Sequence, residues 1–442
     1  MFAKGWTACV VATIATAAAL AGCSKQQVVE EKPAAGYTAG VLSKEFAGTS
    51  VHVLMPPWAK LPKSVITGFT ERTGIEVKWE TLDYDQLHDK IVAMQAAGTA
   101  PADILEMDGG WVGQFGAAGW DTDLRNYLGP ETPHDAVGAK AFSYQDQQIG
   151  VPYSLDFRGS AFNMTMLSKT GITTVPRTYA EVIAAAKAVK KAGLAKYPVG
   201  FPLVISDGSA AAWYSLLRSS GGQILGADGR AALTDGSSAL DSLQFLRTLH
   251  HEGLLDPGSV QLDDGKVDSA FAAGQSAIVL AESPGALTTY ASPKDSRIAK
   301  DQVVFAHTPG PKGTDGPSLG VQEALSIPKA SKHKEAAAMF ITWWLQARNQ
   351  AAAYTDPDGG GGYIPANRAA LEDVVQQGKL KGGQQIIDLL DSIEPVIVNG
   401  PPTWFAKFNR EAASMVQNVA VGNVEPQKGL DDLQAQIARQ VK

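Results

Sequence analysis

Short apolar runs alternate with amphipathic stretches along most of this chain. The apolar runs 51–55 and 103–107 and the alternating segment 75–79 have the lengths and patterns of strands. Between them, apolar residues recur at helical spacing over 63–73, and a second helix is expected over 84–97. This strand–helix–strand order predicts a parallel sheet covered by helices, which is an α/β fold.

Three further helices are indicated by caps and by apolar periodicity. Thr178 and Glu181 have the spacing of a capping box and predict a helix over 178–191. Apolar residues also recur at helical spacing over 237–252 and 335–348. The α/β pattern therefore continues through the second half of the chain.

The first 22 residues have the pattern of a bacterial signal peptide. Lys4 precedes an apolar stretch over 6–20, and residues 20–23 read Leu-Ala-Gly-Cys, which resembles a lipobox. We therefore expect 1–22 to be removed and Cys23 to carry lipid. The alternative is a retained N-terminal helix, although the stretch is short and Ala-rich for a membrane span.

Residues 23–48 are expected to form a flexible tether between the lipidated cysteine and the folded body. Their polar and small residues lack apolar periodicity and cannot bury enough surface to become ordered. The other cysteine, Cys9, lies inside the predicted signal peptide. The mature chain then has no cysteine pair for an intramolecular disulfide and must depend on its core.

Composition narrows the possible classes of function. Hydrophobic residues make up 45%, charged residues make up 19%, and the formal net charge is −7. No run of Lys and Arg appears, so nucleic-acid binding is not expected.

The length after the tether suits two lobes of roughly 200 residues each. Phosphate-loop, zinc and serine-hydrolase motifs are absent from the sequence, so we expect no cofactor, no metal and no catalysis.

Six short segments together resemble one known family. In chain order they are 69–77, 97–104, 150–153, 176–181, 271–278 and 362–366. At these spacings they resemble the extracellular solute-binding proteins of ABC importers, in the sugar-binding family that includes maltose-binding protein. The resemblance covers nearly the whole mature chain.

The resemblance implies a two-lobed periplasmic-binding-protein fold, with hinge strands between the lobes and a central ligand cleft. The first lobe would comprise 49–155 and 312–368, and the second would comprise 156–311 and 369–442. The protein would capture a sugar, with a di- or oligosaccharide expected, and deliver it to the permease subunits of an ABC importer. It would act as a monomer in the periplasm or another extracytoplasmic part of the cell envelope, held to the membrane through Cys23.

A sugar site needs aromatic rings for the apolar sugar faces, and carboxylates, amides and Arg for the hydroxyls. In open α/β sheets such groups lie beyond the carboxyl ends of the strands. The candidate ligand-binding residues are Trp58, Asp108, Trp111, Tyr153, Asp156, Arg158, Trp213, Glu282, Gly320, Tyr363 and Trp404. Trp111 and Trp404 are the expected plates, and Asp108 and Glu282 the expected hydroxyl acceptors.

Other interpretations of these residues stay open. Asp108 could cap the next helix, Asp156 and Arg158 could pair only with each other, and the aromatic residues could belong to the core. The resemblance also has a gap: Gly109 and Gly110 stand where maltose-binding protein has a charged, hydroxyl-binding pair. Maltose therefore need not be the ligand.

Two other classes of function remain as alternatives. A glycosidase would need two carboxylates across one cleft, and Asp108 and Glu282 could supply them. A binder of a non-sugar solute such as a polyamine would need clustered acidic residues, which do not stand out along the sequence.

Replacing Cys23 with Ser tests the predicted anchor. We expect the variant to be released in soluble form or to remain unprocessed, because Ser offers no thiol for acylation. Mass spectrometry of the membrane fraction makes the comparison. An intact segment 1–22 with an unmodified Cys23 in the wild type would contradict the prediction.

Overall fold

The computed structural model describes residues 32–129, 132, 136–313, 316–356, 363–397 and 400–441. The predicted signal peptide 1–22 and Cys23 lie outside these residues. Among the described residues, no helix combines the length and apolar content that a membrane crossing requires. The chain divides into the units Met1–Lys32 and Pro33–Lys442, and the second contains all the helices and strands discussed below.

The end of the predicted tether is packed against the folded body. Tyr37, Leu42 and Phe46 lie against a core cluster, and the Tyr37 hydroxyl donates to the carbonyl oxygen of Tyr127. The expectation that 23–48 is flexible throughout is therefore wrong for the stretch from Tyr37 onward. These three apolar side chains supply the contacts. They are separated by small and polar residues, so the segment has no apolar periodicity from which packing could be predicted.

The first sheet has the strand order β2-β1-β3-β12-β6. Its strands are β1 (Ser50–Met55), β2 (Glu76–Thr81), β3 (Ile104–Asp108), β6 (Val151–Ser154) and β12 (Glu323–Ser326). The first three are parallel, as the sequence predicts, whereas β12 runs antiparallel between β3 and β6. A strand from late in the chain thus lies inside the sheet, between two strands from its first half.

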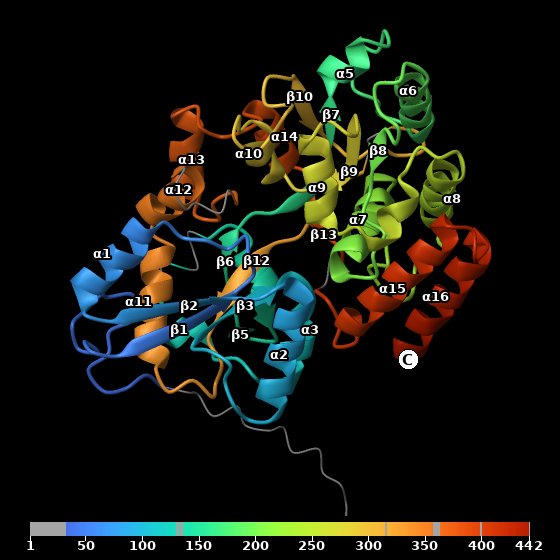
Figure 1. Ribbon diagram of the computed structural model, residues 1–442. Helices are drawn as coiled ribbons and strands as arrows, with labels where there is room; N and C mark the ends of the chain where they lie inside the picture. The colour runs from blue at the N-terminus through green and yellow to red at the C-terminus, as the bar shows by residue number, and fades with distance from the viewer. Residues whose placement is uncertain are drawn as a thin grey trace, which may run out of the picture. The chain divides into compact units, whose positions relative to one another are not determined.

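Helices cover both faces of the first sheet (Figure 1). They are α1 (Lys63–Thr73), α2 (Tyr84–Ala96), α3 (Val112–Ala118), which follows the 3-10 turn η1 (Gly109–Trp111), and α11 (Lys334–Trp344). One core cluster joins α1 and α11 through Phe69, Phe340 and Trp344, and another joins α2 and α3. The predicted helix 335–348 ends at Trp344, and a separate helix, α12 (Ala347–Thr355), follows.

The second sheet has the strand order β13-β11-β7-β9-β8, with β10 paired to β7. Its strands are β7 (Phe157–Asn163), β8 (Val199–Gly200), β9 (Ile278–Glu282), β10 (Val303–Ala306), β11 (Ser318–Gly320) and β13 (Ile393–Pro395). The central strand β7 runs antiparallel to β9, β10 and β11. The outer pairs β8–β9 and β11–β13 are parallel, so this sheet is mixed.

Most of the remaining helices pack around the second sheet (Figure 1). They are α5 (Met164–Ser168), α6 (Tyr179–Lys191), α7 (Asp207–Ser219), α8 (Ser238–His251), α9 (Asp264–Ala272), α10 (Ala286–Tyr290), α14 (Gln384–Leu390), α15 (Phe405–Ala420) and α16 (Pro426–Gln440). Another helix, α13 (Arg368–Gln376), packs on α12 (Figure 1). The shorter elements are the 3-10 turns η2 (Leu124–Asn126), η3 (Ala139–Phe142) and η4 (Pro257–Gln261), and the two-residue strands β4 (Ser143–Tyr144) and β5 (Gln147–Gln148). The predicted capping box at Thr178 and Glu181 is confirmed.

Two short connections join the sheets. The chain passes from β6 to β7 through 155–156 and from β11 to β12 through 321–322, and the Val321 amide donates to the Asp156 carbonyl over 3.0 Å. The sequence put 312–368 in the first lobe, but β11 pairs with β7 and β13, so the chain changes sheet after Gly320. No local pattern shows which sheet a three-residue strand will join.

Asp121 carries a buried carboxyl group in the first lobe. It is 1% exposed, and its backbone forms a bridge with Pro328. Burial raises the pKa of Asp121 to about 7, although Ser326, Lys329 and Gln95 act in the opposite direction. The folded protein therefore holds this proton more tightly than the unfolded chain, in which an Asp has a pKa of about 3.9.

Replacing Asp121 with Asn should change how stability depends on pH. The ionised carboxylate is costly to bury, so its contribution to folding improves as the pH falls from about 7 to about 4. Asn carries no charge, so the variant should be favoured relative to wild type at pH 8 more than at pH 5. Urea unfolding of both proteins at the two pH values measures this difference, and parallel pH profiles would refute the assignment.

Candidate functional site

The ends of several strands bring polar side chains to the boundary between the two sheets. Trp58 follows β1, Asp108 ends β3 and Glu323 begins β12. Asp156 lies in one sheet connection, and Arg158 lies on β7 beside the end of β9. The boundary thus collects groups from segments that lie more than 250 residues apart, as the 265-residue separation of Trp58 and Glu323 illustrates.

Trp58 presents its ring at this boundary. Its side chain is 40% exposed, and the ring stacks on Tyr84 with centroids 5.8 Å apart and 27° between the planes. Tyr84 in turn packs on Trp111, with centroids 5.1 Å apart. The three rings form a ladder in which Trp58 is outermost.

Trp111 does not present its ring at the surface, contrary to the expectation that it is a ligand plate. It is 0% exposed and packs against His88 and Phe115 as well as Tyr84. The 3-10 turn η1 directs the ring into the core between α2 and α3. Trp111 therefore packs on the core side of Tyr84 and supports the ladder there.

A hydrogen-bonded network holds Trp58 to the first sheet. Its indole N–H donates to Glu323 Oε1 over 2.6 Å. The Tyr153 hydroxyl lies 3.1 Å from Glu323 Oε2 and 3.0 Å from Glu106 Oε2. Burial, together with the carboxylates of Asp156 and Asp108, raises the pKa of Glu323 to about 8. Tyr153 is 0% exposed, so it affects the site by holding the Glu323 carboxyl group in place.

The sequence prediction missed Glu106 and Glu323. Glu106 is an acidic residue in the apolar run 103–107, and that contrast was a usable signal. Burial and the nearby Glu323 raise its pKa well above the ordinary value. Glu323 had no such signal, because its place beside Trp58 depends on where β12 inserts.

Asp108 is half-buried and does cap the turn that follows it. Its Oδ1 accepts from the Gly110 amide over 2.6 Å, which confirms the capping interpretation. Burial raises its pKa, and the hydrogen bonds from Gly110 and Tyr84 act in the opposite direction. The carboxylate is held rigidly next to Tyr84 and can accept further hydrogen bonds at its second oxygen.

Asp156 and Arg158 each have a partner other than one another. The Ser283 hydroxyl donates to Asp156 Oδ1 over 2.7 Å, and an Arg158 guanidinium nitrogen lies 3.2 Å from Asp264 Oδ2. Burial opposes the charge of Arg158, but the carboxylates of Asp264 and Asp156 outweigh it and raise its pKa. The guanidinium is therefore fixed and charged at the boundary.

Glu282 is held in a buried network instead of standing free as a hydroxyl acceptor. It is 4% exposed, and the Tyr290 hydroxyl lies 2.9 Å from Glu282 Oε2 and 2.8 Å from Asp268 Oδ1. Burial and Asp268 raise the pKa of Glu282 well above the ordinary value. The residue before it, Ala281, has a φ of 59°, where the pairing of β9 with β7 is irregular. That bulge turns the end of the strand and buries Glu282.

The other candidates have mainly structural positions. Trp213 is 0% exposed and donates to Ser242 Oγ over 2.9 Å, so it belongs to the core. Tyr363 is also buried and accepts a hydrogen bond from Trp344 Nε1 over 2.9 Å. A side chain at Gly320 would meet Ile393 at 2.6 Å.

Trp404 lies at the start of α15, half-buried against Phe408, with ring centroids 5.6 Å apart.

The described residues contain no group of three or more His, Cys, Asp or Glu side chains arranged to hold a metal ion.

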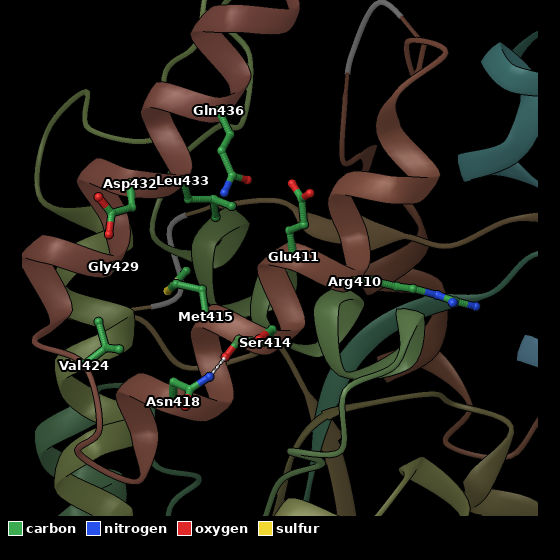
Figure 2. A pocket seen from close by; sticks show the side chains of 10 residues that line it. All are labelled: Arg410, Glu411, Ser414, Met415, Asn418, Val424, Gly429, Asp432, Leu433 and Gln436. Carbon is green, nitrogen blue, oxygen red and sulfur yellow. Dashed lines mark hydrogen bonds between the residues drawn. The ribbon is translucent and has the colours of Figure 1, made fainter.

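A separate hollow of about 390 Å³ lies between α15 and α16. Its lining includes Glu411, Met415, Asp432 and Gln436, and Figure 2 shows Arg410 extending away from these side chains. None of the candidate residues lines it, so this hollow is distinct from the boundary site.

Comparison with known proteins gives a consistent picture. A family model described as "Bacterial extracellular solute-binding protein" matches residues 56–351. The Sinorhizobium fredii protein called "Probable amino-acid ABC transporter periplasmic-binding protein" is 22% identical over 425 residues, which cover 90% of this chain and 91% of that one.

Two solved structures are similar in fold. An ABC-transporter solute-binding protein from Thermotoga lettingae bound to α-D-tagatose has a TM-score of 0.77 and 22% identity, over 89% of this chain and 100% of that one. Another, from Agrobacterium radiobacter in complex with ribitol, has a TM-score of 0.76 and 20% identity, over 89% and 99%. These likenesses establish the two-lobed α/β fold.

Truncating the two ends of the aromatic ladder should have different effects on stability. Trp111→Ala should lower the free energy of unfolding by about 3–5 kcal/mol, because it leaves a cavity in a closed core. Trp58→Ala should cost less, because Trp58 is already 40% exposed and its removal leaves no closed cavity. Urea melts of both variants measure this, and equal losses would show that Trp58 is a core residue.

Proposed function

This chain belongs to the bacterial extracellular solute-binding protein family, and we propose that the solute it captures for an ABC importer is a sugar or polyol. The observation that carries the proposal is the exposed ring of Trp58. Glu323 holds the indole N–H of this ring, and the acceptor Asp108 and the donor Arg158 lie at the same boundary between the two sheets.

Polyhydroxy solutes suit this set of groups. The face of an indole ring covers the apolar C–H face of a sugar, and carboxylates accept hydrogen bonds from its hydroxyls. Asp108 ends β3 of the first sheet, and Asp156 lies in the connection that leads to the second sheet. Arg158, held by Asp264, can donate to a ring or hydroxyl oxygen.

The connections between the sheets offer a route to ligand-dependent closure. Segments 155–156 and 321–322 run side by side, and each carries or adjoins candidate residues, Asp156 in one and Glu323 after the other. A solute held by groups on both sides would favour the closed arrangement, because it binds that arrangement more tightly. We propose that the closed form is the one that the permease recognises.

The rest of the transport role follows the same proposal. The protein would work as a monomer, with its lipidated Cys23 holding it at the membrane near the permease subunits. More than one acyl chain is needed for stable anchoring. The location outside the cytoplasm agrees with the family to which the chain belongs.

A cationic solute such as a polyamine is the second candidate. Among the described residues named at the boundary, the carboxylates of Asp108, Asp156 and Asp264 outnumber the guanidinium of Arg158, while Glu323, with its pKa raised to about 8, is mostly protonated at neutral pH. An ammonium group would find both a negative potential and an aromatic face there.

A glycosidase is less well supported. The carboxyl group of Glu282 is enclosed by Tyr290 and Ser283, so it does not complete a catalytic pair with Asp108. We propose that a bound sugar is released unchanged. Chromatography after incubation with stoichiometric protein tests for products.

Calorimetric titration of the folded body with sugars, polyols and polyamines tests the proposal. We expect a sugar or polyol to bind, and Trp58→Ala to raise its Kd about ten- to a hundredfold, because an aromatic anchor is worth about 1–3 kcal/mol. Trp58→Phe is the matched control: it keeps a ring but loses the donor to Glu323, and should retain part of the affinity. Binding of polyamines alone would favour the second candidate, and binding unaffected by Trp58→Ala would place the site elsewhere.

A further inference from the structure

The start of α15 lies directly against the first lobe, next to the candidate site. A Cβ atom at Gly113, on α3, would overlap the carbonyl oxygen of Pro401 and lie 2.8 Å from the carbonyl carbon of Pro402. A Cβ atom at Gly110 would lie 3.5 Å from the Phe405 ring. The backbone of one lobe is thus in contact with the backbone that leads into a helix of the other.

Apolar packing and an ion pair extend this contact. Phe405 is 2% exposed and belongs to the core cluster of the second sheet, whereas Ala406 packs on the cluster that contains α2 and α3. Farther along the same edge, Arg410 on α15 lies 3.3 Å from Asp89 on α2. We call the face formed by 401–406 against Gly110 and Gly113 the α3–α15 contact.

The α3–α15 contact begins where the candidate site ends. The Cβ position of Gly110 lies 2.9 Å from Asp108 Oδ1 and 3.5 Å from Phe405, so the ring and this carboxylate flank the same glycine. Burial, together with the charge of Asp108, also raises the pKa of Asp207, at the start of α7, to about 7. The second lobe therefore covers the first immediately beyond Asp108.

The sheet connections limit the site on another side. Asp156 and Val321 are hydrogen-bonded through their backbones, as described above, which holds the two connections side by side. A ligand that lies on Trp58 and reaches Asp108 thus has the connections on one side and Phe405 beyond it.

We infer that the α3–α15 contact is an end wall of the ligand space, and that the protein takes a single monosaccharide or a linear polyol and excludes sugar chains. The inference rests on the proposed function and departs from the expectation of a di- or oligosaccharide. A second sugar unit beyond Asp108 would need the space that Phe405 and Pro401 occupy. Separating them would expose the buried Phe405 ring and lose the packing of Ala406.

Gly113 is the residue that permits the wall to form. Any side chain there meets backbone atoms, which cannot rotate away as a side chain could. Gly116, one turn later on the same helix, offers a matched comparison: its Cβ would overlap the ring of Tyr144, which belongs to the same lobe.

The size limit is tested by calorimetric titration of the wild-type protein with alditols and monosaccharides, and with di- and trisaccharides built from the same units. The best single unit should bind about a hundredfold or more tightly than its trisaccharide, a difference of about 2.7 kcal/mol. A trisaccharide that binds as tightly as any single unit overturns the inference and leaves the proposed function standing. Failure of every carbohydrate and polyol to bind overturns both.

Gly113→Ala and Gly116→Ala test the wall itself. Gly113→Ala should raise the Kd of the best ligand about tenfold or more, since the added Cβ opposes the α3–α15 contact, and it should also lower the melting temperature of the ligand-free protein, because that Cβ would overlap the carbonyl oxygen of Pro401. Gly116→Ala should lower that melting temperature and leave the Kd within about twofold of wild type. Wild-type affinity in Gly113→Ala would show that the contact does not bound the ligand.

Discussion

The insertion of β12 between β3 and β6 is the constraint on which the rest of the site depends. This antiparallel strand places Glu323 opposite Asp108 on one side and Ser154 on the other. It therefore sets where the chain leaves the first sheet and where it returns. The Trp58 ring has its position because Glu323 is there to accept its N–H group.

The chemistry of the site follows from burying carboxyl groups next to one another. Glu106, Glu323 and Tyr153 share a pair of hydrogen bonds, and on the other side Glu282, Asp268 and Tyr290 repeat the arrangement. In each set a tyrosine hydroxyl lies between two carboxyl groups whose pKa values are raised, first of all by burial. Such networks fix side-chain geometry because a buried acceptor left without a donor is costly. The groups that keep partial exposure between these sets are Asp108, Asp156 and Arg158.

The glycine-rich segment after β3 has a steric role in this arrangement. Compared with maltose-binding protein, Gly109 and Gly110 seemed to mark a missing hydroxyl-binding pair. In the fold, Gly110 accommodates Phe405 and Gly113 accommodates the backbone at Pro401. The lack of side chains thus allows two lobes to approach closely at a point where a charged pair would hold them apart. The glycine-rich segment therefore differs from the matching segment of maltose-binding protein in the space that it leaves between the lobes as well as in its chemistry.

The sequence by itself determined the α/β order, the parallel first three strands, the capping box at Thr178 and the family. These features depend on local periodicity and on residues adjacent in the chain, and they also place Asp108, Asp156 and Arg158 at strand ends. Tertiary structure alone decided that Trp58 is exposed while Trp111 and Trp213 are buried, that Glu282 is enclosed, and that β11 joins the second sheet. A tryptophan in a loop has the same local pattern whether it faces solvent or the core. Its exposure is set by α2, β12 and α15, which come from separate parts of the chain and are brought together only by the tertiary fold.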